Sequence, residues 1–151
     1  MTAVQGTDPL VELLAERHFG VLASIKSDGR PQLSNVVYAF TPDPSTPGAG
    51  VARISITTGR AKYRNLLRDP RASLHVSAPD FWSYAVAEAL ADLSPVAADP
   101  QDQTVEDLVA LYRDIQGEHP DWQEFRQAMV TGQRVMLRLA VSRVYGMAGS
   151  G

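Results

Sequence analysis

Two cations occur where a helix is expected to begin, in the segment SITTGRAKYRNLLRDPRASL, residues 55–74. Arg60 and Lys62 follow a hydroxyl-rich strand, and Gly59 permits a tight turn into the helix that leaves backbone N–H groups free. A helix N-terminus carries partial positive charge, so cations there are repelled unless an anion lies between them. No acidic residue lies three or four positions from either cation. The pattern predicts a phosphate-binding site.

Hydroxyl groups beside the two cations could donate further hydrogen bonds to a phosphate. They belong to Ser55, Thr57 and Thr58. The alternative interpretation is a short amphipathic helix whose basic residues form an ordinary solvated face. Arg64 and Arg68 fit this alternative, because they lie in the C-terminal half, where the helix dipole favours cations.

The composition is typical of one globular domain. The chain has 151 residues, 44% hydrophobic and 21% charged, and we expect a single domain over 1–151 with flexible tails at 1–7 and 148–151. The net charge of −3 argues against nucleic acid as a partner. No apolar run is long enough to span a bilayer and no signal peptide is evident, so we expect a soluble, cytoplasmic protein that does not bind membranes.

The cysteine and histidine content argues against a metal site. The chain has no cysteine, and its three histidines are far apart in the sequence without ligand spacing. Arginine is much commoner than lysine, which occurs only as Lys26 and Lys62, and alanine is abundant. This composition is associated with GC-rich genomes and favours an actinobacterial source.

The hydrophobic periodicity predicts about six strands with helices between them. We expect strands over residues 19–26, 31–40, 51–58, 71–79, 80–95 and 133–147, and helices that start near residues 9, 60, 104 and 122. Asp8 and Asp121 are the expected N-caps, and Thr104 with Asp107 forms a capping-box pattern. The alanines of residues 80–95 suit a helix equally well, so that segment has two interpretations.

Polar groups occur on both faces of the second expected strand. Alternation places Leu33, Asn35 and Val37 on one face, and the residues between and beside them on the other: Gln32, Ser34, Val36 and Tyr38. Strands joined mainly by hairpins pair antiparallel and tend to close into a barrel. A small barrel has no room for a large ligand, so the ligand is expected on the outer wall or in a cleft shared with a second subunit.

Three stretches resemble the split β-barrel flavin and deazaflavin oxidoreductases related to pyridoxamine phosphate oxidase. They are FGVLASIKSDGRPQLSNVVYAF, SITTGRAKYRNLLRDPRASL and FWSYAVAEALADL, and they are most similar to the mycobacterial branch that uses coenzyme F-420. The resemblance implies a mainly β fold, a six-stranded antiparallel split β-barrel with peripheral helices. It also implies that Arg60 and Lys62 bind the cofactor phosphate. The cofactor ring would then lie against the second and third strands, near Gln32, Ser34, Asn35, Thr57 and Thr58.

The same resemblance implies a homodimer with a cofactor groove between the two barrels. Trp82 and Tyr84 would reach the site or the interface, although a packed barrel wall or a dimer interface without ligand contact explains them equally well. The helical residues Trp122, Phe125 and Met129 are expected in the core. The implied activity is hydride transfer from reduced coenzyme F-420 to an activated double bond of a small molecule, with no catalytic side chain assigned. An FMN-dependent enzyme and a non-catalytic cofactor carrier are the alternatives.

Overall fold

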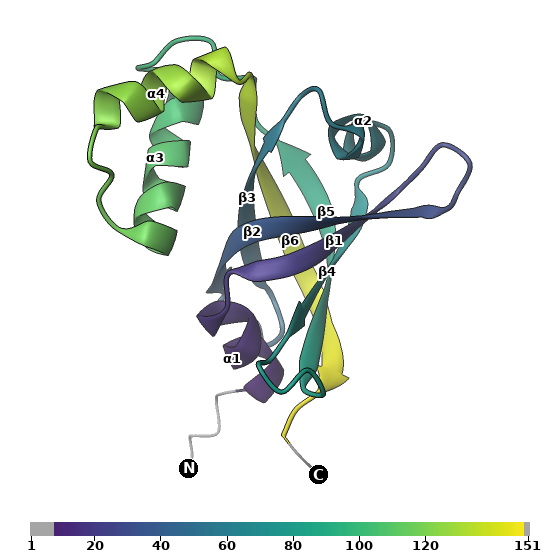
Figure 1. Ribbon diagram of the computed structural model, residues 1–151. Coiled ribbons are helices and arrows are strands. Elements are labelled where there is room, and N and C mark those ends of the chain that lie inside the picture. The colour runs from purple at the N-terminus through teal and green to yellow at the C-terminus, as the bar shows by residue number, and fades with distance from the viewer. Residues whose placement is uncertain (1–7, 150–151) are drawn as a thin grey trace.

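Six antiparallel strands close into a barrel in the order β1-β2-β3-β6-β5-β4 (Figure 1). The computed structural model describes residues 8–149. Of the predicted flexible tails, 1–7 and 148–151, all but residues 148 and 149 lie outside the described residues. The strands are β1 Phe19–Ile25, β2 Pro31–Pro42, β3 Gly50–Thr57, β4 Arg71–Ser77, β5 Tyr84–Leu93 and β6 Arg134–Met147. The helices are α1 Pro9–Glu16, α2 Ala61–Arg68, α3 Gln103–Gln116 and α4 Trp122–Thr131.

The predicted fold class, a mainly β antiparallel barrel with peripheral helices, is confirmed. Each strand pairs with two neighbours, and the segment that also suited a helix forms β5, which pairs with both β4 and β6. Its inward alanines, Ala85, Ala87 and Ala89, are buried, because small side chains fit the narrow interior of a closed barrel. Among residues 8–149, no helix is long and apolar enough to cross a membrane.

The alternation predicted for β2 is also confirmed. Val36 and Tyr38 are buried inside the barrel, whereas Leu33 is 66% exposed on the outside. The Tyr38 hydroxyl donates a hydrogen bond of 2.6 Å to the carbonyl oxygen of Leu14, which fastens α1 over one end of the barrel. Burial raises the pKa of Tyr38 above its usual value because it penalises the charged phenolate.

The helix caps were predicted correctly at two of three positions. Asp8 and Asp121 each accept a backbone hydrogen bond at the N-cap of α1 and α4. The predicted capping box of α3 is wrong, because Asp102 is the N-cap and accepts from the backbone N–H of Val105 at 2.9 Å. The Thr104 hydroxyl instead donates to the carbonyl oxygen of Pro95, which ties the start of α3 to the loop after β5.

The two helices between β5 and β6 pack together on one side of the barrel (Figure 1). Arg53 of β3 pairs with Asp114 of α3, and Arg138 of β6 pairs with Asp107 of the same helix at 2.9 Å. Helix α4 is held to α3 by an ion pair between Arg126 and Glu106 at 2.8 Å. These contacts hold α3 against the outer wall of the barrel, beside β2, β3 and β6.

The buried hydroxyl of Tyr38 gives a test of the packing of α1. Tyr38→Phe should lower the free energy of unfolding by about 1–2 kcal/mol, because the Leu14 carbonyl loses its partner in a buried place. Chemical denaturation followed by circular dichroism measures this change. Tyr145→Phe is the control, since Tyr145 is 42% exposed, and equal stability of the two variants would contradict the assigned role of the Tyr38 hydroxyl.

Candidate functional site: a cationic pocket beside the barrel

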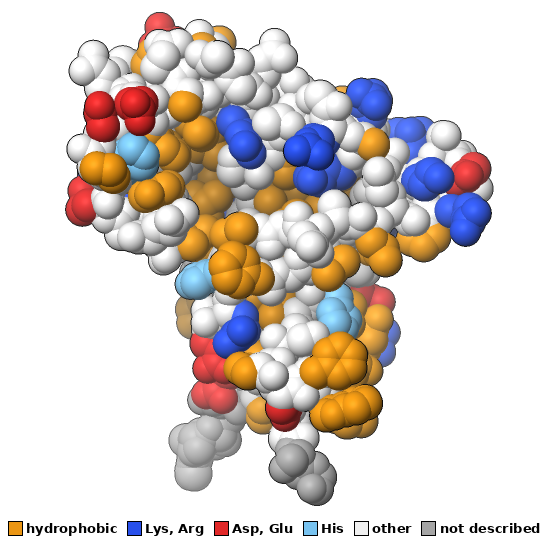
Figure 2. All heavy atoms as spheres, viewed as in Figure 1, with side chains coloured by type: hydrophobic (Ala, Val, Ile, Leu, Met, Phe, Trp, Pro, Cys, Tyr) orange, Lys and Arg blue, Asp and Glu red, His pale blue; other side chains and the backbone are white. Residues whose placement is uncertain are grey.

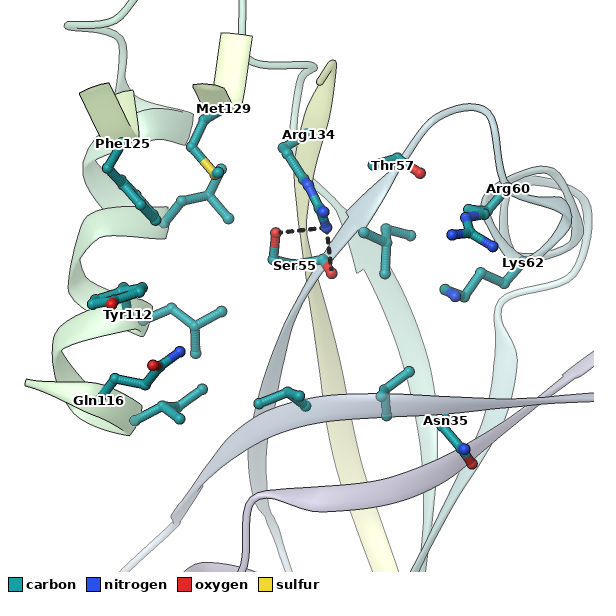
Figure 3. Close-up of a pocket in the computed structure, with 16 residues that line it drawn as sticks. Asn35, Ser55, Thr57, Arg60, Lys62, Tyr112, Gln116, Phe125, Met129 and Arg134 are labelled. Carbon is teal, nitrogen blue, oxygen red and sulfur yellow. Dashed lines mark hydrogen bonds between the residues drawn. The ribbon is translucent and has the colours of Figure 1, made fainter. Parts of the chain in front are cut away.

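A pocket of about 440 Å³ lies between the outer wall of the barrel and the α3–α4 pair (Figure 3). Its polar side is formed by β2, β3, the start of α2 and the start of β6, and its apolar side by α3 and α4. Figure 2 shows the pocket as a hollow with orange hydrophobic side chains, next to a group of blue basic side chains. The two kinds of surface face each other across one cavity.

Three cations line the polar side of the pocket: Arg60, Lys62 and Arg134. Arg60 is the N-cap of α2, but its side chain makes no capping hydrogen bond, and the first turn of the helix contains no acidic residue. Arg134 starts β6 and pairs in register with Thr57. Its guanidinium donates to the carbonyl oxygen of Ser55 at 3.3 Å and to the Ser55 hydroxyl at 3.4 Å, so that it points into the same space (Figure 3).

The electrostatics of this cluster favour an anion. Burial lowers the pKa of Lys62 below its usual value, and repulsion by Arg60 and Arg134 lowers it further. Burial and the charge of Arg60 likewise lower the pKa of Arg134. Among the described residues that line the pocket, none is acidic. A phosphate here would neutralise like charges that repel one another and would meet an uncapped helix end, so these residues fit the phosphate of a nucleotide-like cofactor.

The opposite side of the pocket is an apolar wall. We define this wall by Leu108, Leu111, Tyr112, Ile115, Phe125 and Met129. Phe125 and Met129 are only half-buried, and α4 has no buried residue, so the prediction that Trp122, Phe125 and Met129 lie in the core is wrong in this respect. They pack against the buried clusters from outside, and Phe125 and Met129 present their remaining surface to the pocket.

The structure brings half of the predicted site residues together in this pocket. Those that line it are Asn35, Ser55, Thr57, Arg60 and Lys62. The others, Gln32, Ser34, Thr58, Trp82 and Tyr84, are not among its lining residues. Ser34 shares the inward face of β2, and the Thr58 hydroxyl donates to the Gln133 side chain at 3.4 Å.

Gln32 has a different role, in holding α2 on the barrel. Its side-chain oxygen accepts a hydrogen bond from the buried amide of Asn65, which also donates to the Ser24 hydroxyl at 3.3 Å. Arg68 donates to the carbonyl oxygen of Ile25 at 2.7 Å and to Asn65 at 3.1 Å. Arg68 therefore anchors α2, and the expectation that it lies on a merely solvated face is wrong. This network fixes the helix whose first turn faces the pocket.

Trp82 and Tyr84 lie at the other end of the barrel. Tyr84 pairs with Met147, the last residue of β6, whereas the pocket contains Arg134, the first residue of that strand. The Trp82 side chain is 73% exposed, and the Tyr84 ring stacks on His75 with 5.4 Å between ring centroids. Within one chain neither residue reaches the three cations.

Sequence reasoning missed Arg134 and the pocket-facing surface of the α3–α4 pair. Arg134 is remote in sequence from Arg60, and only the register of β3 with β6 brings it beside Ser55 and Thr57. One available signal was the position of Arg134 as a cation at the start of a strand otherwise rich in apolar residues. Nothing in the periodicity of α4 distinguishes a side chain that faces a pocket from one that faces a core.

Comparison with known proteins identifies the family. Residues 7–148 match the pyridoxamine 5′-phosphate oxidase family, and the chain therefore belongs to it. An F-420 reductase of known structure superimposes with a TM-score of 0.68 at 24% identity, over 92% of this chain and 98% of that one. A conserved hypothetical protein from Mycobacterium tuberculosis gives 0.67 at 20% identity, over 100% of this chain and 93% of its own.

A heme binding protein from Mycobacterium smegmatis also shares the fold, with a TM-score of 0.68 and 20% identity. All of this chain is covered in that comparison, but only 57% of the other one. The common feature of these structures is the barrel, the fold of the family's flavin and deazaflavin oxidoreductases.

The lowered pKa of Lys62 predicts how the ligand-free protein responds to pH. Because the folded pKa of Lys62 lies below its unfolded value, the unfolded chain holds more protons between the two values, and stability contributed by this group rises with pH through that window. Unfolding measured across that window should show this rise in the wild type but not in Lys62→Met. If both proteins gave the same pH dependence, burial and the neighbouring cations would not lower the pKa of Lys62.

Proposed function

We propose that this protein is an oxidoreductase that uses the deazaflavin coenzyme F-420 and transfers hydride to a conjugated small-molecule acceptor, and that it acts in the cytoplasm. The observation that carries the proposal is the grouping of Arg60, Lys62 and Arg134, without an acidic partner in the pocket lining, opposite an apolar wall. A phosphate-bearing cofactor with a flat ring has both the charge and the apolar surface that such a pocket accepts. The resemblance of residues 55–74 to the F-420-dependent branch and the similarity of fold to an F-420 reductase favour this cofactor.

Each part of the pocket has a role in this proposal. Arg60, Lys62 and Arg134 would hold the phosphate, and Ser55 and Thr57 lie beside it on β3. The apolar wall would exclude water from the ring. The bound coenzyme supplies a hydride from its central ring carbon. Among the described lining residues none is Asp, Glu or His, and we assign no catalytic acid or base.

Two alternatives share the same anion site. FMN also carries a phosphate on a flat ring system, so an FMN-dependent enzyme on this barrel would use the same cations. A non-catalytic carrier would bind the cofactor without passing hydride onward. Titration of the purified protein with F-420 and with FMN, followed by absorbance, distinguishes the cofactors, and tighter binding of FMN would contradict our choice. Turnover with reduced F-420 and a panel of quinones and enones tests the carrier alternative, which complete inactivity would favour.

Removal of either predicted phosphate ligand should weaken cofactor binding. Arg60→Ala and Lys62→Ala should each raise the dissociation constant of F-420 by about ten- to a hundredfold, since each loses a charge-assisted hydrogen bond. Fluorescence titration of the coenzyme measures this, and higher salt should weaken the wild type more than either variant. Melting curves should show no loss of stability, because removal of one cation relieves repulsion in the ligand-free protein.

The control for this experiment is Arg64→Ala. Arg64 lies on the same helix and is exposed, and the described residues provide it with no hydrogen bond or ion pair. Arg68 is unsuitable because it anchors the helix to Ile25. If Arg60→Ala and Lys62→Ala bound F-420 as tightly as Arg64→Ala, the phosphate site would be elsewhere.

We further propose that the protein is a homodimer whose cofactor groove lies between the two barrels. The outer face of β1 and β2 exposes Phe19, Leu33 and Val37, and Val37, paired in register with Phe19, also lines the pocket. The apolar surface is therefore continuous with the site. In such a dimer the exposed Trp82 and the neighbouring Tyr84 would lie at the interface or approach the partner's groove.

Light scattering tests the shared groove. The chain should elute with the mass of a dimer, and Leu33→Glu should dissociate the dimer and lower F-420 affinity together, because a charge at this exposed apolar position, outside the pocket lining, opposes burial in the interface. The exposed Leu67→Glu, on α2, is the matched control and should do neither. A stable wild-type monomer that still binds F-420 would contradict the shared groove.

A further inference from the structure

Helix α4 is placed as a cover of the pocket and contributes little to the core. None of its residues is buried, and its ion pair to α3, between Arg126 and Glu106, is supplemented by a hydrogen bond of 2.9 Å from Arg126 to the carbonyl oxygen of Pro100. Yet Phe125 and Met129 turn toward the pocket from this helix (Figure 3). Two large apolar side chains at this position need a ligand surface to cover them fully.

The apolar wall is built from side chains that fit a flat ring. The Phe125 ring packs edge to face on Tyr112, with 5.2 Å between ring centroids, and the Tyr112 ring contacts Trp122 at 5.6 Å. This packing fixes the orientation of the aromatic rings. Met129 is unbranched and adapts to irregular shapes. The wall therefore offers both a rigid aromatic surface and an adjustable one.

A polar group lies at the edge of the same wall. Gln116 is the last residue of α3, lines the pocket and is exposed, and none of the described residues forms a hydrogen bond with its side chain. Its side-chain NH₂ can donate a hydrogen bond to a carbonyl oxygen. The three cations are on the other side of the cavity, where a cofactor phosphate would neutralise them. The region around Phe125, Met129 and Gln116 is thus uncharged, and its side-chain donors are the Gln116 amide and the Tyr112 hydroxyl.

We propose that the α3–α4 pair forms the acceptor subsite, and that it selects flat, uncharged, conjugated ring compounds with a carbonyl oxygen facing Gln116. The statement that this subsite holds the acceptor rests on the proposed function. The preference for flat, uncharged rings with a carbonyl depends only on Phe125, Met129 and Gln116. Phe125 and Met129 contact the rings, and Gln116 determines the preference for a carbonyl. A charged acceptor would bind weakly on this side of the pocket, because no group there compensates the free energy of removing its charge from water.

Equilibrium dialysis with two probes of the same ring shape tests the subsite. Menadione is a flat naphthoquinone, and 2-methylnaphthalene has the same rings without the carbonyls. The wild type, saturated with oxidised F-420, should bind menadione about three- to tenfold more tightly than 2-methylnaphthalene, since a menadione carbonyl accepts a hydrogen bond from the exposed Gln116 and 2-methylnaphthalene has no acceptor. Gln116→Leu should lose most of this preference. An unchanged preference in Gln116→Leu would overturn the role of Gln116.

Variants of the wall test the ring contacts. Phe125→Leu and Met129→Ala should weaken binding of both probes by about five- to tenfold, while Gln123→Ala, an exposed position on the same helix, should not. The dissociation constant of F-420 is measured for each variant separately. If F-420 fails to bind even the wild type, the proposed function is wrong, and the same dialysis without coenzyme then tests the wall. If F-420 binds but the wall variants hold both probes like Gln123→Ala, the acceptor subsite is wrong.

Discussion

The arrangement depends on one unfavourable interaction, the repulsion among Arg60, Lys62 and Arg134. Each cation is placed by an element that the barrel fixes: the N-cap of α2, its first turn and the start of β6. Burial and mutual repulsion lower the pKa of both Lys62 and Arg134. Such a cluster lowers the stability of the ligand-free protein, and the fold alone does not require it. An anion that binds there supplies the negative charge that the pocket lining lacks.

The barrel keeps this cluster together because its closure leaves little freedom to relax. β3 is paired on both edges, with β2 and β6, so Ser55, Thr57 and Arg134 stay in register. Helix α2 is held by the buried Asn65, which bonds to Gln32 and Ser24. The interior is filled by side chains such as Tyr38 and Leu22, so a ligand has to lie outside the barrel, where the α3–α4 pair provides the second side of a cavity.

Local patterns in the sequence predicted most of the fold. The alternation of β2 and the caps Asp8 and Asp121 depend on neighbours within a few residues. The cap of α3 was misplaced because Asp102 and Thr104 are both good capping residues, and only the Thr104 bond to Pro95 separates them. At the site, Arg60 and Lys62 were found from one short segment. Arg134 and Phe125 required strand register and helix packing, which no local pattern contains.

A crystal structure of the protein with bound F-420 tests the central claim most directly. The account predicts the coenzyme phosphate within hydrogen-bonding distance of Arg60 and Lys62, with Arg134 beside it, and the ring against β2 and β3, with the acceptor subsite between the ring and the α3–α4 wall. A phosphate bound away from these cations, or a ring that leaves the cavity empty, would contradict it.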